Sequence, residues 1–420
     1  MRSPAFLLAV VAVSLALMLT RPRRIAEAWW ISGGALLLLL TGAIAPAAAV
    51  HAVGKGTDVY AFLIGMMLLS ALARDNGVFD WLSAAALRRA GGSTSRLFAL
   101  VYVVGVVVTT MMSNDATAVV LTPAILATTR RAKVNPLPHL YACAFVANAA
   151  SFVLPISNPA NLVVFRGAVP SLGRWLAAFA LPSALSIVTT YLVLRAFFRA
   201  DFAKIIEVEP EASPLSSRGR LVVLGLVVVS AALLVASAIG VELGLPTLVC
   251  ALVVTAFVCV VGRTSPLPLV REVSWSTLML VAGLFVLVEA VEGVGALTLT
   301  RHWLAGLAAM TPAVGTFVAG FTVGVANNVV NNLPLGLLAG GAMHSAPVDR
   351  LLRSAILIGV DLGPNLAVTG SLATILWLLA LRASRVHVGF LDFFRIGVVV
   401  MPTALASALL GALVVHALGG

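Results

Sequence analysis

Residues 97–129 read LFALVYVVGVVVTTMMSNDATAVVLTPAILATT, an apolar run with the polar cluster Ser113-Asn114-Asp115 at its centre. Since a membrane-spanning helix needs about 20 apolar residues, the run is too short for two spans and too long for one. We therefore expect a re-entrant helical hairpin with its polar tip near the midplane, where irregular backbone must line a cavity or pack against protein. The hairpin should enter from the cytoplasm, because basic residues favour that side and flank the run at both ends: Arg88, Arg89, Arg96, Arg130, Arg131 and Lys133.

The rest of the chain has the composition of a polytopic membrane protein. Of its 420 residues, 61% are hydrophobic and only 10% are charged, which is far less charge than a soluble domain of this size carries. We expect an all-α, multi-pass protein of the bacterial inner membrane with about ten transmembrane helices. Two re-entrant hairpins accompany them, the one described above and a second at 311–346. The helices are expected near 4–20, 28–50, 58–74, 140–166, 174–198, 220–240, 244–262, 275–291, 351–381 and 393–416.

Charge and motifs exclude several other classes of protein. The net charge of +11 comes from Lys and Arg in short loops between apolar blocks, a pattern of membrane topology rather than of nucleic-acid binding. The three cysteines, Cys143, Cys250 and Cys259, lie inside apolar blocks and form no metal-binding motif. No phosphate-binding loop occurs, so we do not expect the chain to hydrolyse ATP itself. We expect no enzymatic activity, no cofactor and no metal site.

The second half of the chain repeats the first. Residues 311–346 form another apolar run with a polar centre, Asn331-Asn332, and each run is followed by an apolar segment interrupted by Pro and polar residues. With about five spans per half, the halves insert in opposite orientations. Inverted repeats with paired broken helices are a transporter design that binds substrate at the midplane. The expected units are a first inverted repeat at 1–199 (hairpin 97–129, broken helix 140–166), a cytoplasmic linker at 200–219 and a second inverted repeat at 220–420 (hairpin 311–346, broken helix 351–381).

Two carboxyl groups occupy the polar centres. Asp115 lies in the first hairpin tip, and Asp361 lies in the break of the helix that follows the second hairpin. A carboxylate at midplane depth is costly and is by default a candidate for an ion or proton pathway. We expect both groups to bind and release protons, as a proton-coupled carrier requires. The alternative is a structural role, in which each group accepts hydrogen bonds from backbone N–H groups freed at the hairpin or break.

Neutral polar side chains accompany these acids and are expected to contact the substrate. Amides and hydroxyls can bind a hydroxyl-bearing solute, and they can equally bond the backbone of their own helix or break. No Lys or Arg lies within the polar centres, although an anionic substrate would normally require one. The site therefore favours a neutral polyhydroxylated solute or a small cation. The predicted substrate-binding residues are Ser113, Asn114, Thr117, Ser157, Asn158, Asn161, Asn331, Asn332 and Asn365.

These motifs resemble those of the bacterial arsenite and antimonite efflux permeases (ArsB type) of the ion transporter superfamily. The resemblance covers nearly the whole chain and is most specific over 358–378, which reads IGVDLGPNLAVTGSLATILWL. Three positions depart from it: Pro159 stands where the best-known members have no proline, Asn148 stands where we would expect an acidic residue, and Asn365 stands where we would expect a basic one. The resemblance implies that the binding motifs fall on Asn114, Asp115, Ser157, Asn158, Asn331, Asn332 and Asp361.

The resemblance also implies the activity and the partners. It implies a secondary carrier that exports As(OH)3 or Sb(OH)3 in exchange for protons by alternating access, and a cytoplasmic arsenite-stimulated ATPase that can convert such a carrier into a pump. A sodium–proton antiporter or an organic-anion symporter on the same scaffold is the alternative, and the lack of a basic residue argues against the anion. A membrane subunit that transports nothing is the third hypothesis. The duplicated polar hairpins argue against it, because polarity at the midplane is costly without a pathway.

Overall fold

The computed structural model describes residues 4–20, 22, 25–165, 168–203, 205–206, 214–345 and 348–419. Throughout these residues the regular structure is helical, and the extended segments amount to one isolated bridge between Ser93 and Ile205. Eight helices are long and apolar enough to cross a membrane, and shorter apolar helices accompany them. The expected class, a polytopic all-α membrane protein, is therefore confirmed. The linker expected at 200–219 lies partly outside the described residues.

The spanning helices divide into inner and outer ones by burial. The apolar windows of α4 and α15 are each 61% buried, whereas those of α11 and α12 are 28% buried. Because the exposed faces of α11 and α12 are apolar, these two helices are suited to contact lipid. The eight helices are α4 (Thr57–Asp75), α6 (Thr94–Met111), α11 (Leu172–Phe197), α12 (Ser217–Ala238), α13 (Gly244–Gly262), α15 (Trp275–Gly293), α17 (Pro312–Val330) and α21 (Phe390–Ala417).

One segment that was expected to form a single spanning helix forms two helices instead. After α1 (Pro4–Thr20), the segment expected at 28–50 forms two helices, α2 (Glu27–Leu40) and α3 (Pro46–Gly54). Gly42 has a φ of 69°, a left-handed conformation that ends α2 and that glycine adopts at little cost. Pro46 then begins α3, where its missing N–H group has no helical partner to lose.

The first hairpin has an irregular tip. Helix α6 ends at Met111, and the chain returns through the one-turn helix α7 (Asn114–Ala116), the π-helical segment η2 (Thr117–Leu121) and α8 (Thr122–Arg131). The hydroxyl of Ser113 caps α7 by accepting a hydrogen bond from the N–H of Ala116 at 3.2 Å. Short π-helical turns inside α-helices occur frequently at functional sites, so the backbone conformation also makes this tip a candidate functional site.

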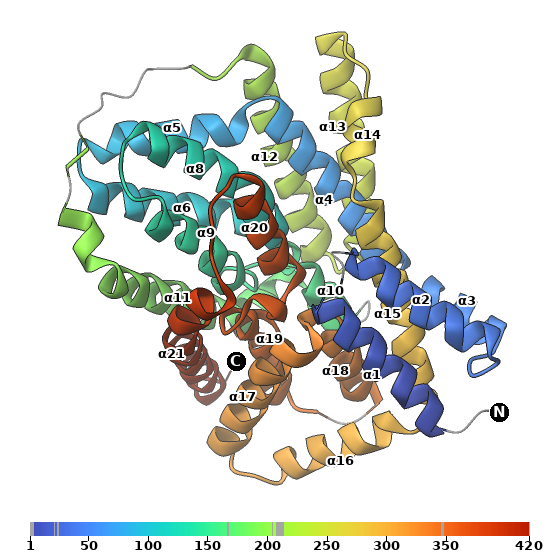
Figure 1. Cartoon of the computed structure of the whole chain (residues 1–420). Helices are drawn as coiled ribbons and strands as arrows, with labels where there is room; N and C mark the ends of the chain where they lie inside the picture. Colours follow the sequence, from blue (N-terminus) through green and yellow to red (C-terminus); the bar gives the residue numbers. More distant parts are fainter. Residues whose placement is uncertain are drawn as a thin grey trace.

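The second hairpin is sharper. Helix α17 is followed directly by α18 (Asn332–Ser345), and Asn331 between them has a φ of 77°. Its ψ of 151° lies outside the left-handed helical region that asparagine favours, so Asn331 holds a strained conformation that is found mainly for glycine. Each hairpin is preceded by a short helix, α5 (Val78–Ala90) or α16 (Ala296–Ala308), and these two lie at opposite ends of the bundle (Figure 1).

Two segments break in the middle of the bundle. The first runs through α9 (Leu137–Ala149), the turn η3 (Pro155–Ser157) and α10 (Pro159–Phe165). The second runs through α19 (Arg350–Leu362), the turns η5 (Gly363–Asn365) and η6 (Val368–Gly370), and α20 (Leu372–Ala383). Proline supplies no backbone N–H and clashes with the preceding turn, which explains why both breaks contain it.

Helix packing brings the hairpin tips and the breaks together. Helix α4 packs on α13 and α2 packs on α15, while α17 packs on α19 and α11 packs on α21. Between these groups, α10 from the first break packs on α18 from the second hairpin and also contacts α4 (Figure 1). The polar residues of both halves therefore meet at the centre of the molecule, beside α4 and α15.

Candidate substrate site

Four helices begin around one small cavity at this centre. The first residues of α7, α10, α18 and α20 are Asn114, Pro159, Asn332 and Leu372, and all four line the cavity. The start of a helix leaves several backbone N–H groups without intrahelical partners. Side chains bond one of them at each start, those of Ala116, Ala160, Leu333 and Thr374, and the remaining ones are potential hydrogen-bond donors. The cavity has a volume of about 20 Å³, which is enough for a water molecule and requires expansion before a larger solute can enter.

Acceptor groups line the same cavity. Asp115 contributes a carboxyl group, and Asn114, Asn158 and Asn332 contribute amides. The side-chain oxygen of Asn114 is buried and has no hydrogen-bond partner among the described residues. A solute that carries several hydroxyl groups must both donate and accept hydrogen bonds, and this cavity offers both kinds of partner.

Asp361 lies behind the cavity rather than in its wall. The carboxyl group is fully buried, and its Oδ1 accepts a hydrogen bond from Nδ2 of Asn158 at 2.8 Å. The side-chain oxygen of Asn158 in turn accepts from the N–H of Ala160 at 3.0 Å. Asn158 is therefore the direct link between Asp361 and the cavity.

Two of the predicted hydroxyl groups hold the first hairpin and the first break in shape. The hydroxyl of Thr117 lies 2.8 Å from that of Thr109 on α6. The hydroxyl of Ser157 donates to the carbonyl of Thr110 at 3.1 Å, which ties the break to the hairpin. Neither Thr117 nor Ser157 is among the described residues that line the cavity.

Two of the predicted amides also bond the backbone. Nδ2 of Asn161 donates to the carbonyl of Ser151 at 2.9 Å, and Nδ2 of Asn331 donates to the carbonyl of Thr369 at 3.2 Å. Both amides satisfy carbonyl groups that the helix breaks leave free, which buried backbone requires. The structure thus places Asn161 and Asn331 around the cavity as supports, whereas Asn332 lies in its wall.

Two of the positions that depart from the resemblance, Asn148 and Asn365, contact each other. Nδ2 of Asn148 donates to Oδ1 of Asn365 at 2.9 Å, although the two residues are 217 positions apart in the chain. Nδ2 of Asn365 donates to the carbonyl of Phe145 at 3.1 Å. Asn365 is fully buried and does not line the cavity in the described structure, so its contacts join α9 to the second break.

Two further polar residues, Thr277 and Ser371, lie in the cavity wall but are not among the predicted substrate-binding residues. Thr277 lies in the first turn of α15 and is the only contribution of that helix, among the described residues, to the wall. Ser371 caps α20 by accepting from the N–H of Thr374 at 3.1 Å. A hydroxyl near the start of an apolar span is an ordinary helix cap, and the sequence held no sign that Thr277 would face the two hairpins.

A second cavity opens from the small one toward the end of the bundle that carries α5 and α8, here termed the basic end. It has a volume of about 270 Å³. Ser113 lines this cavity, and Asp115, Thr277 and Leu63 line both cavities. At its far side Arg74 of α4 forms an ion pair with Glu272 of α14 (Leu267–Glu272). Asp115 is therefore the acid that both cavities share.

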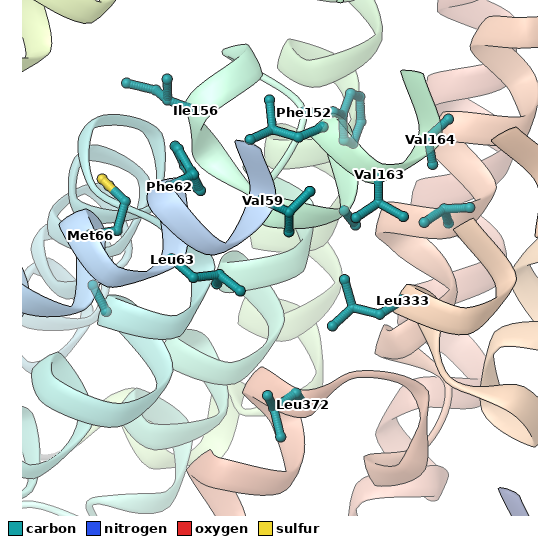
Figure 2. Close-up of a cluster of buried hydrophobic side chains, with 14 of the residues drawn as sticks. Val59, Phe62, Leu63, Met66, Phe152, Ile156, Val163, Val164, Leu333 and Leu372 are labelled. Carbon is teal, nitrogen blue, oxygen red and sulfur yellow. The ribbon is translucent and has the colours of Figure 1, made fainter. Parts of the chain in front are cut away.

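A third cavity, of about 470 Å³, lies toward the opposite end and contains an ion pair between Lys55 and Glu289 at 2.7 Å. Among the described residues, it shares no lining residue with the small cavity. Buried apolar side chains from α4, α10 and α18 form one cluster (Figure 2), in which Leu63 and Leu333 line the small cavity while Val59 and Val163 line the third. They include Val59, Leu63, Val163 and Leu333, which we term the apolar barrier.

Carboxylate, imidazole and thiol groups do not cluster at this site. Within the described ranges, no group of three His, Cys, Asp or Glu side chains is close enough to hold a metal ion. Asp115 lies in the cavity wall, whereas Asp361 is bonded to Asn158 and is not part of the wall. The wall can therefore form reversible hydrogen bonds through its amides, hydroxyls and carboxyl group.

A polytopic bundle with broken helices and a polar cavity at its centre is the architecture of a secondary transporter. The family profile described as "CitMHS: Citrate transporter" matches residues 14–381. The chain belongs to this transporter family.

Relatives extend the match to the full fold. The chain is 26% identical over 417 residues to the "Arsenical pump membrane protein" of Escherichia coli (strain K12), covering 93% of this chain and 94% of that protein. It is 22% identical over 418 residues to the "Putative arsenical pump membrane protein" of Bacillus subtilis (strain 168), covering 93% and 95%. The crystal structure of the Alcanivorax borkumensis YdaH transporter superposes with a TM-score of 0.58 at 15% identity, covering 88% of each chain. The resemblance to the arsenical pump membrane proteins is thereby confirmed.

Proposed function

We propose that this protein exports arsenite and antimonite, as As(OH)3 and Sb(OH)3, from the cytoplasm in exchange for protons by alternating access. One observation carries the proposal: the central cavity is lined by an acid, amides and hydroxyls and, among the described residues, by no Arg, Lys or His. A neutral trihydroxylated solute can donate to Asp115 and to amide oxygens and accept from amide and helix-start N–H groups.

The same lining argues against citrate as the substrate. A tricarboxylate normally takes guanidinium or ammonium partners that offset the loss of its hydration, and among the described residues the cavity wall offers helix starts, amides and hydroxyls but no Arg or Lys. The carboxyl group of Asp115 would repel it whenever that group is ionised. The family includes carriers described by citrate, and its arsenical pump relatives show that one fold serves more than one solute.

The cavities support a cycle with two accessible states. We place the basic end in the cytoplasm, because positive residues favour that side. In the present conformation the small cavity shares Leu63, Asp115 and Thr277 with the 270 Å³ cavity on that side, and we infer that the apolar barrier (Figure 2) closes the opposite side. Movement of α10 and α18 relative to α4 would part the barrier. Because the two halves are proposed to be inverted repeats, the state open to the cytoplasm and the state open to the outside would have similar helix arrangements.

Asp115 and Asp361 are the proposed proton carriers. Asp115 is in contact with the cytoplasmic cavity, so it can release a proton there when arsenite binds. Asp361 reaches the cavity only through Asn158, so a change in its protonation alters the amide that faces the substrate. In this scheme the amides bind the metalloid and the acids couple its movement to protons.

The positions of the three cysteines suit a carrier that releases trivalent arsenic rather than one that retains it. Trivalent arsenic binds thiolates tightly, and an exporter must release it. Cys143 and Cys259 are buried, and none of the three cysteines lines the central cavity in the described structure. Substrate held by hydroxyl and amide groups alone can leave when the barrier opens.

Transport by inverted membrane vesicles tests the proposal. Arsenite uptake should follow an imposed proton gradient and should be insensitive to sodium. Uptake of citrate or sodium in place of arsenite would overturn the substrate and move the chain to the alternative activities. A cytoplasmic ATPase partner remains a prediction of the resemblance, and stimulation of arsenite uptake by the added ATPase with ATP, in vesicles without a proton gradient, would test it.

A further inference from the structure

A large cavity lies away from the central site. It has a volume of about 860 Å³ and sits at the end of the bundle opposite the basic end. The starts of α11 and α19 and the ends of α10, α12 and α21 surround it, through residues such as Arg174, Arg353, Phe165, Ala238 and His416. It lies between the outer helix α12 and the helices that carry the second break.

This cavity is strongly basic. Arg174, Arg350 and Arg353 line it together with His416, and no acidic residue does so among the described residues. Within the same part of the chain, none of the three arginines forms an ion pair. The nearby carboxylate of Asp349 instead accepts from the N–H of Leu352 at 2.7 Å and caps α19. The cavity thus holds guanidinium groups that form no ion pair with any described acidic residue.

Membrane insertion does not account for these arginines. Lys and Arg are normally scarce on the outer side of an inner-membrane protein, yet three of them meet at this one space. Two helices, α11 of 26 residues and α19 of 13 residues, also begin here. Their N-terminal dipoles favour a negative charge, and the hydroxyl of Ser171 at the start of α11 makes no capping bond. Charge and backbone therefore favour the same kind of ligand.

The rest of the wall is apolar. Phe165, Ala178, Phe179, Ile239 and Val415 line the cavity beside the arginines. A free inorganic anion would leave these surfaces in contact with water, whereas a molecule with an anionic head and hydrocarbon chains would cover them. Guanidinium groups bind phosphate through paired hydrogen bonds. The wall therefore matches both parts of a phospholipid.

We propose that this cavity is a binding site for an anionic phospholipid of the outer leaflet. The arginines hold its phosphate, and its acyl chains lie against α12 and the end of α21. The site is separate from the central cavity and does not depend on the transported solute. The bound lipid fills the space between α12 and the helices of the second break, so it also supports the packing of α19.

Native mass spectrometry of the purified, detergent-solubilised protein tests the site, with phosphatidylglycerol, phosphatidylcholine or inorganic phosphate added in turn. We expect retention of phosphatidylglycerol and not of phosphatidylcholine. The double variant Arg350→Gln/Arg353→Gln should bind phosphatidylglycerol roughly 30-fold more weakly, since each basic residue near a lipid surface contributes about fivefold. The matched control, Arg382→Gln/Arg395→Gln, removes two exposed arginines outside this cavity and should bind as the unchanged protein does.

Three outcomes would overturn the proposal. They are equal binding of phosphatidylcholine, unchanged binding by the double variant, or displacement of the lipid by an equal concentration of inorganic phosphate, which would make the cavity a site for free anions. If the double variant does not fold, Arg174→Gln on the other helix replaces it. That single change should weaken phosphatidylglycerol binding about fivefold, and no weakening would equally reject the site.

Discussion

Replacing Asn158 by alanine should lower the free energy of unfolding of the protein and should also raise its KM for arsenite. The amide of Asn158 donates to Asp361 at 2.8 Å and accepts from the N–H of Ala160 at 3.0 Å, and it also lines the cavity. The variant leaves a buried carboxyl oxygen and a buried N–H group without those partners, which costs about 1–3 kcal/mol for each group. It also removes one hydrogen bond to the substrate, so the KM for arsenite should rise about threefold to tenfold.

Asn365→Ala is the matched control. Asn365 is also fully buried and makes two side-chain hydrogen bonds, with Asn148 at 2.9 Å and with Phe145 at 3.1 Å, but it does not line the cavity. Its loss of stability should be similar, and its KM should be unchanged. Thermal unfolding in detergent and arsenite uptake into inverted vesicles measure the two quantities. A rise in KM that is equal in both variants, or absent in Asn158→Ala, would refute the assignment of Asn158 to the cavity wall.

Three further predictions test the coupling, the pathway and the packing. Asp115→Asn and Asp361→Asn should each fold and should each lose pH-driven arsenite transport; normal pH-driven transport in both variants would reject the two acids as proton carriers. Ser70→Cys, in the 270 Å³ cavity, should react with a membrane-impermeant thiol reagent added from the cytoplasmic side. Thr57→Cys, in the 470 Å³ cavity, should react with the same reagent added from outside. The reverse pattern would show that the topology is inverted. Gly340→Ala should lower the free energy of unfolding by about 1–3 kcal/mol, because the added Cβ would lie 2.6 Å from a backbone carbonyl of α10; thermal unfolding unchanged from the parent protein would show that α10 and α18 pack less closely.

The polar tips of the hairpins could be predicted from the sequence because polarity inside an apolar run is costly in lipid. Asn114, Asp115, Asn158 and Asn332 were all predicted from their surroundings in the chain, and the structure brings them to one cavity. The division of 28–50 into two helices was missed, although Gly42 is part of the signal. Hydropathy averaged over a long window hides a turn of a few small residues.

Long-range contacts could not be predicted from local pattern. The bond between Asn158 and Asp361 joins residues 203 positions apart, and nothing near either residue indicates its partner. For the same reason, the sequence could not tell Asn332, which lines the cavity, from Asn161, which bonds the carbonyl of Ser151. Amides are equally suited to a solute and to free backbone, so only packing decides which role each one has.

Arsenite uptake into inverted vesicles, with the proton gradient present and then collapsed by an uncoupler, tests the central claim most directly. Citrate and sodium are measured in the same preparation, and vesicles that lack the protein give the background. Proton-coupled arsenite export predicts accumulation of arsenite that disappears with the uncoupler, with no citrate uptake. Accumulation of citrate, or proton-driven sodium uptake without arsenite, would contradict it and would assign the same fold to a different solute.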